Sequence, residues 1–160
     1  MADKKDLLTE GMAAPDFTAP STEGDITLSA LRGRTVVLYF YPKDDTPGCT
    51  REACAFRDLK ADMAALGAVV IGVSKDKPAS HEKFKTKYGL NFPLVSDPDL
   101  SIHEAYGAWA PKTLYGKTAL GVVRSTFVID GAGVVRKAWR GVKVDGHDAK
   151  VLEVVRGLAS

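Results

Sequence analysis

The chain has 160 residues, of which 45% are hydrophobic and 26% charged, and its formal net charge is +2. This length predicts one domain over residues 1–160, with a loose segment at 1–10 and a core that needs neither disulfide nor metal. The small net charge gives no reason to expect nucleic acid or membrane as a partner. Two cysteines cannot form a disulfide framework, and the start lacks the apolar stretch of a secretion signal. We therefore expect a cytoplasmic protein whose cysteines are catalytic or redox-active.

The first predicted elements are a small hairpin and a buried strand. Pro15–Pro20 and Asp25–Leu28 alternate in polarity around a turn, which predicts a β-hairpin. Residues 29–33 form a single capped turn in this interpretation. Thr35–Tyr41 is β-branched and aromatic without polar alternation, which is typical of a strand buried on both faces.

A helix is predicted next, from Thr46 to about Leu66, where apolar residues recur at helical spacing. Ala68–Ser74 is a second buried strand. Pro78–Tyr88 is a charged, amphipathic helix that Gly89 ends.

The second half of the chain continues the alternation of strands and helices. A strand is predicted at Phe92–Ser96, a helix at Asp97–Tyr106 and a loop at 107–123. The two strands of a hairpin follow at Arg124–Asp130 and Val134–Trp139, and a closing helix at 146–158. The loop contains Trp109 and Tyr115, which either border an apolar pocket or pack against the body. Strands alternating with helices imply a largely parallel sheet covered on both faces, with the last two strands as an antiparallel edge. This order is compatible with a thioredoxin-like α/β fold.

Both cysteines lie in Phe40–Cys54, which joins the carboxyl end of a buried strand to a helix N-terminus, where open α/β sheets bind ligands. Thr46 suits the N-cap and Pro47 the first helical position. Gly48 lets another group approach the backbone closely. Cys49 falls in the first turn, where free N–H groups and the helix dipole favour a thiolate, the nucleophilic form of cysteine.

Counting charged residues does not decide whether Cys49 ionises, because possible cations and carboxylates are equally numerous. The cations are Lys43, Arg51 and Arg124, which is distant in the sequence, and the carboxylates are Asp44, Asp45 and Glu52. The alternative interpretation is that Cys49, and more plausibly Cys54, is an inert buried residue.

The spacing of the two cysteines limits how they can react together. Five residues along a helix separate two Cα atoms by about 8.7 Å. A disulfide allows at most about 7 Å. Cys49 and Cys54 therefore cannot form a disulfide unless the start of the helix unwinds.

Other classes of site find no support in the sequence. His81, His103 and His147 lie far from Cys49 in or beside polar helical segments, and we expect all three on the solvated surface. None is paired with Cys49 as in a thiol protease, no CxxC motif is present, and two cysteines without nearby histidines make a zinc site improbable. Residues 131–133 form a hairpin turn rather than a phosphate loop. We expect no metal and no other cofactor.

The motif Pro42-x-x-x-Thr46-x-x-Cys49 resembles the active-site signature of peroxiredoxins. The longer segment 40–58 is similar to the bacterioferritin comigratory protein branch, also called peroxiredoxin Q. Further similar blocks lie at Gly11–Phe17, Tyr106–Trp109, Tyr115–Lys117 and Arg124–Asp130, so the resemblance covers about residues 11–158.

This resemblance implies a thiol peroxidase that reduces hydrogen peroxide and organic hydroperoxides. Cys49 would be the peroxidatic cysteine that becomes a sulfenic acid. Thr46 would hydrogen-bond the thiolate and the peroxide, and Pro42 would shield the sulfenic acid. The backbone N–H of Gly48 would bind the peroxide oxygen. Arg124, which the residues alone place on the surface, would hold the thiolate and stabilise charge as the O–O bond breaks.

The resemblance also implies that Cys54 resolves the sulfenic acid of Cys49 as an intramolecular disulfide, which thioredoxin or a similar dithiol reductant then reduces. Members of the branch are often monomers, and no second chain is needed for this bridge. The alternative is a redox sensor or binding module switched by oxidation of Cys49 and Cys54. Thr46 and Arg124 favour the enzyme, since a switch needs no activated peroxide.

Overall fold

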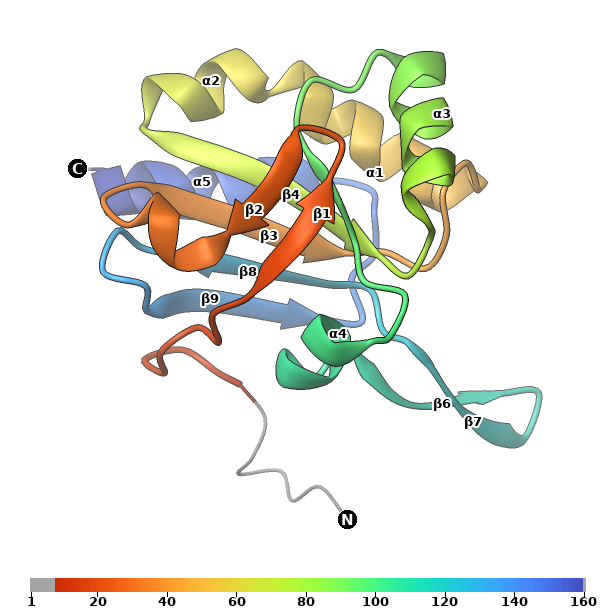
Figure 1. Cartoon of the computed structure of the whole chain (residues 1–160). Helices are drawn as coiled ribbons and strands as arrows, with labels where there is room; N and C mark the ends of the chain where they lie inside the picture. The colour runs from red at the N-terminus through yellow and green to blue at the C-terminus, as the bar shows by residue number, and fades with distance from the viewer. Residues whose placement is uncertain (1–7, 160) are drawn as a thin grey trace.

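The structure is a computed structural model that describes residues 8–159, so most of the segment expected to be loose lies outside the described residues. Figure 1 shows a central sheet flanked by helices and a separate two-stranded ribbon. In chain order the elements are β1 (Thr18–Ser21), β2 (Gly24–Thr27), the 3₁₀ helix η2 (Leu28–Leu31), β3 (Thr35–Phe40), α1 (Pro47–Asp58), α2 (Lys60–Ala65), β4 (Ala68–Ser74), α3 (Pro78–Tyr88), β5 (Leu94–Ser96), α4 (Ser101–Ala105), β6 (Trp109–Leu114), β7 (Lys117–Val122), β8 (Ser125–Ile129), β9 (Val135–Arg140) and α5 (His147–Ala159).

The central sheet is mixed, with seven strands in the order β2-β1-β5-β4-β3-β8-β9. β3 pairs in parallel with β4, and β4 with β5. β8 is antiparallel to β3 and β9 to β8, which confirms the expected antiparallel edge. Within the described residues, only two of the six strand pairings of this sheet are parallel, so the expectation of a largely parallel sheet is wrong. The hairpin β1–β2 joins the other side of the sheet through Ser21 and Val95. β3 therefore ends in the middle of the sheet, and its last residue leads directly into the segment that carries Cys49.

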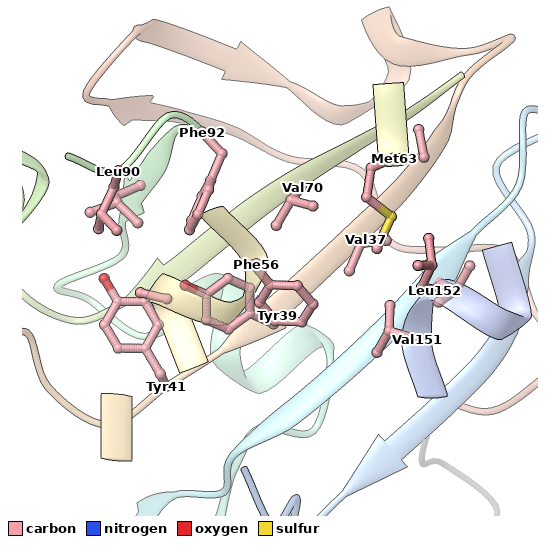
Figure 2. Packing of buried hydrophobic residues seen from close by; sticks show 14 of the residues in the cluster. Val37, Tyr39, Tyr41, Phe56, Met63, Val70, Leu90, Phe92, Val151 and Leu152 are labelled. Atoms are coloured by element: carbon pink, nitrogen blue, oxygen red, sulfur yellow. The ribbon is translucent and has the colours of Figure 1, made fainter. Parts of the chain in front are cut away.

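Side chains of β3 alternate between two hydrophobic clusters, one on each face of the sheet. Val37, Tyr39 and, just after the strand, Tyr41 point to the face covered by α1, α2, α3 and α5, where Figure 2 shows Tyr39 beside Phe56. Their neighbours along the strand point to the face covered by α4 and the N-terminal segments. The absence of polar residues in this strand is thus explained by burial on both sides.

The helix predicted from Thr46 to Leu66 is two helices, α1 and α2, separated by Leu59. Leu59 has φ −95° and ψ 5°, outside the helical range. The carbonyl of Arg57 accepts a hydrogen bond from Asn91 Nδ2 (3.2 Å), a partner 34 residues away that helical spacing does not reveal.

The loop predicted over 107–123 is a β-ribbon formed by β6 and β7. Its two-residue turn is Tyr115-Gly116, and both residues have positive φ, 53° and 78°. Tyr115 lies at the tip and is 95% exposed, so it does not pack against the body as one interpretation of this segment held. Figure 1 shows the ribbon extending away from the central sheet.

The surface placement predicted for the three histidines is wrong. His81, His103 and His147 are 0%, 0% and 4% exposed. Burial is possible because each imidazole has a hydrogen-bond partner that lies elsewhere in the sequence. His81 bonds Asp44 and His103 bonds Asp97, while His147 bonds Thr126. Within residues 8–159 no helix is long and apolar enough to cross a membrane.

Candidate active site

Cys49 lies in the first turn of α1, directly behind the carboxyl end of β3. The helix begins at Pro47, and its first four-residue hydrogen bond runs from Thr50 N to Thr46 O (2.8 Å). The N–H groups of Gly48 and Cys49 precede that bond and remain available to an anion, as at any helix start. Cys49 is 1% exposed, Cys54 is partly buried, and both are free thiols.

Arg124 reaches Cys49 from the short connection between β7 and β8. Its Nη2 donates to the Cys49 Sγ at 3.3 Å, and its Nη1 donates to Glu52 Oε1 at 2.7 Å. The side chain is 16% exposed, so the surface position suggested by the residues alone is wrong. A Cβ at residue 48 would lie 3.4 Å from Nη2, an ordinary van der Waals contact, so Gly48 borders the guanidinium closely.

Glu52 completes an ionic pair beside the thiol. Burial raises its pKa to about 7, although Arg124 opposes that rise. Burial lowers the pKa of Arg124, but Glu52 and Cys49 outweigh it, so this pKa rises above its usual value. From the sequence we interpreted Glu52 only as a negative charge that opposes ionisation of the thiol. Its place three residues after Cys49, on the same face of the helix, was the signal that it shares a partner with the thiol.

Three of the other charged residues near Cys49 bond groups away from the thiol. Arg51 donates to Asp145 at 2.5 Å on the surface. Asp45 accepts from Lys87, and Asp44 is buried against His81. The cation that bonds the thiol is thus a residue 75 positions away.

Thr46 occupies the predicted N-cap position of α1, but its side chain accepts no hydrogen bond from the first turn of the helix. The prediction that its hydroxyl caps the helix is therefore wrong. Its hydroxyl donates instead to Lys43 O at 2.9 Å, closing a tight turn across Asp44 and Asp45. Pro42 follows Tyr41, whose N–H still bonds Val73 O (3.1 Å), and is partly buried where the strand pairing stops. Both residues therefore flank one short loop, residues 42–46, that leads into α1.

One group of side chains offers potential metal ligands, because ligand atoms of Asp44, Asp76 and His81 lie within 4.8 Å of one another. The Nδ1 of His81 is only 2.7 Å from Asp44 Oδ2, a hydrogen-bond distance. Two ligands of one tetrahedral zinc would be about 3.3 Å apart, given bonds near 2.0–2.1 Å. We interpret this group as a hydrogen-bonded network rather than a metal centre.

Comparisons with known proteins bear on this arrangement. Residues 11–138 match the AhpC/TSA family model. A putative peroxiredoxin, bcp, of Coxiella burnetii is 50% identical over 143 residues, covering 89% of this chain and 95% of its own. Peroxiredoxin Bcp of Bacillus subtilis is 45% identical, with coverage of 93% and 96%.

A solved structure of the Xanthomonas campestris bacterioferritin comigratory protein has a TM-score of 0.88 and 40% identity, and the match covers 96% of this chain and 98% of that one. It was described in work on alkyl peroxide reduction by that protein. The neighbour has the thioredoxin-like peroxiredoxin fold that the resemblance implied. The chain belongs to the AhpC/TSA family and is a thiol peroxidase of the peroxiredoxin kind.

Proposed function

We propose that Cys49 is the peroxidatic cysteine of this enzyme. Its thiolate attacks one peroxide oxygen, an S–O bond forms as the O–O bond breaks, and the sulfur becomes a sulfenic acid. The other oxygen leaves as hydroxide or alkoxide and takes a proton to become water or an alcohol. The observation that carries this proposal is the 3.3 Å hydrogen bond from Arg124 Nη2 to the Cys49 sulfur in the first turn of α1.

The groups around the sulfur supply complementary interactions for the peroxide. Arg124 stays charged throughout, so it can hold the thiolate and then stabilise the leaving oxygen. The Thr46 hydroxyl gives its proton to Lys43 O, so toward the substrate it acts as an acceptor for the hydroperoxide O–H. The N–H groups of Gly48 and Cys49 face the developing negative charge, and Pro42 limits access of water.

Cys54 is the resolving cysteine in this proposal. It lies five residues after Cys49 in α1, so the first turns of α1 must unwind before its thiolate can attack the sulfenic acid and release water. A thioredoxin or similar dithiol then reduces the disulfide by exchange. The bridge lies within one chain, which supports a monomer. The alkyl peroxide activity named for the Xanthomonas protein supports organic hydroperoxides as substrates beside hydrogen peroxide.

The test compares Cys49→Ser with Cys54→Ser in steady-state peroxide consumption with thioredoxin and its reductase. We expect Cys49→Ser to consume no peroxide, because the nucleophile is gone. Cys54→Ser should react with one equivalent and then stall, and the mass of wild-type protein after one equivalent should correspond to an internal disulfide with less helix by circular dichroism. Turnover by Cys49→Ser would reject the nucleophile, and normal cycling by Cys54→Ser would reject the resolving role. A redox sensor would show the disulfide without turnover.

A further inference from the structure

Asp44 lies at the centre of the loop that connects Pro42 to Thr46, yet its side chain is only 3% exposed. Three side chains converge on its carboxylate. Tyr41 Oη donates to Oδ1 at 2.6 Å, Ser80 Oγ donates to Oδ2 at 2.8 Å, and His81 Nδ1 lies 2.7 Å from Oδ2. A buried carboxylate with every oxygen bonded fixes the backbone that carries it.

The other nitrogen of His81 defines where the protons lie. Nε2 is 2.9 Å from the carbonyl oxygen of Val95 in β5, and a carbonyl can only accept, so Nε2 carries a hydrogen. Nδ1 then faces the carboxylate of Asp44, and a second proton must lie between these two atoms. Both ring nitrogens are thus hydrogen-bonded, and the imidazole is clamped between α3, β5 and the loop.

The backbone of the same loop is held as well. Asp44 N donates to Asp76 Oδ2 at 2.8 Å, and Ser74 Oγ donates to the same oxygen at 2.7 Å. The next residue, Asp45, has φ +59°, a left-handed conformation that is strained for a residue with a side chain. Such a conformation persists only where its surroundings determine it.

The surroundings that determine it belong largely to α3. Asp45 accepts from Lys87 Nζ at 2.8 Å and from Tyr88 Oη at 2.6 Å, near the end of that helix. Asp44 is bound near its start, by Ser80 and His81. Residues 42–46 are thus fixed to both ends of α3, a helix that contributes no residue to the cysteine site itself.

We propose that Asp44 and His81 are positioning residues for peroxide reduction, which hold the loop 42–46 so that Thr46 and the start of α1 meet the peroxide at the Cys49 sulfur. This inference rests on the proposed role of Cys49. The pair touches neither the sulfur nor the substrate and acts through the loop. A misplacement of about 1 Å at such a loop can lower a rate by up to a hundredfold.

The chain offers a matched control, because Asp97 and His103 form a second buried pair. His103 Nδ1 lies 2.6 Å from Asp97 Oδ2, and the two side chains are 0% and 2% exposed. Its side-chain hydrogen bonds stay within residues 97–103 and do not include residues 42–46. His81→Gln and His103→Gln therefore remove comparable buried imidazoles, of which one supports the active-site loop.

The experiment measures two rates on each full-length reduced protein: oxidation of Cys49 by hydrogen peroxide, and alkylation of the same thiol by iodoacetamide. Alkylation needs the thiolate but not the peroxide geometry. We expect His81→Gln to slow oxidation about tenfold to a hundredfold, with alkylation changed less than about threefold. His103→Gln should leave both rates within about twofold of the wild type. Urea unfolding curves define the folded fraction of each variant.

Equal slowing of oxidation in the two variants, or an unchanged oxidation rate in folded His81→Gln, would overturn the proposal. Should His81→Gln fail to fold, Ser80→Ala removes one hydrogen bond to the same carboxylate, and oxidation slowed by several-fold at constant alkylation is then required. If the proposed function itself were wrong, peroxide would not oxidise Cys49 in the wild-type protein, a result that is distinct from slower oxidation in a variant.

Discussion

Two buried aspartate–histidine pairs with almost the same geometry lie in different regions of this molecule. Nδ1 and Oδ2 are 2.7 Å apart in Asp44–His81 and 2.6 Å apart in Asp97–His103. The partners are 37 residues apart in the first pair and six in the second. The Asp97 pair is thus local: its carboxylate also accepts the backbone N–H of His103 (2.8 Å), and it fixes the start of α4. The Asp44 pair instead joins the active-site loop to α3.

Each pair lies beside a residue with strained backbone. Asp45 (φ +59°) follows Asp44, and Leu100 (φ +67°) lies between Asp97 and His103. In both regions, a buried carboxylate with several donors holds a conformation that the sequence alone disfavours. The same chemistry thus shapes a helix start in one region and an active-site loop in the other, depending on the elements that the pair connects.

The two pairs differ in the hydrogen bonding of the second ring nitrogen, Nε2, of each histidine. Nε2 of His81 donates to a carbonyl, whereas Nε2 of His103 is buried without a partner within the described residues. Burial raises the pKa of Asp97, but the hydrogen bonds from the His103 ring and backbone outweigh it, and the pKa falls below its usual value.

The largest effect should follow from removing either carboxylate. Asp44→Ala and Asp97→Ala each leave a buried imidazole without its partner, and each should lower the free energy of unfolding by about 3–5 kcal/mol. Urea denaturation at pH 7 measures this. Asp58→Ala is the control, because its ion pair with Arg57 is on the surface, where water screens it, and its loss should change the unfolding free energy little.

Only Asp44→Ala should slow peroxide oxidation per folded molecule. If Asp97→Ala slowed oxidation as much, stability rather than the position of the loop would limit the rate, and the two pairs would not differ in function.

The third buried histidine, His147, differs from the other two because its partner is a hydroxyl, Thr126 Oγ1 at 2.8 Å, and not a carboxylate. Burial, aided by the charge of Lys150, lowers its pKa to about 4. The unfolded chain takes up a proton near pH 6.5, while the folded protein does not until about pH 4. Folding stability from this group is therefore lost as pH falls through that window, by roughly 3 kcal/mol.

Glu52 has the opposite sign over a similar range. Its pKa is about 7 in the folded protein against 4.5 unfolded, so its contribution to stability is lost as pH rises between these values. The difference in unfolding free energy between wild type and His147→Gln cancels the Glu52 contribution and should show the histidine effect alone. A difference that stays constant from pH 4 to 7 would mean that this imidazole is not buried in its neutral form.

Local patterns in the sequence were sufficient for the scaffold of the site. The unbroken apolar run before Pro42 predicted a central strand, and the residues around Pro47 predicted the helix start that holds Cys49. Both follow from interactions within about one turn or one strand. The ribbon β6–β7 was missed because its turn is Tyr115-Gly116, not one of the common turn pairs that mark a hairpin.

Long-range partners could not be predicted in the same way. Arg124 is 75 residues from Cys49, and only the family resemblance assigned it to the site. The burial of His81 depends on a carboxylate 37 residues away, and nothing in the polar pattern of α3 reveals it. The proposed positioning pair is thus a product of the fold, and one residue of it was predicted on the surface.

The smallest effect, and the most selective, comes from Tyr41→Phe. It deletes the hydrogen bond to Asp44 Oδ1, which should lower the unfolding free energy by about 1–2 kcal/mol and slow peroxide oxidation a few-fold. Because Tyr41 and His81 bind the same carboxylate, the double variant with His81→Gln should depart from additivity by about 0.5 kcal/mol or more. The double variant with His103→Gln should be additive, since the two residues share no hydrogen-bond partner. Additivity in both cycles would mean that Asp44 does not couple Tyr41 to His81 of α3. The two pairs would then differ only in the sequence separation of their partners.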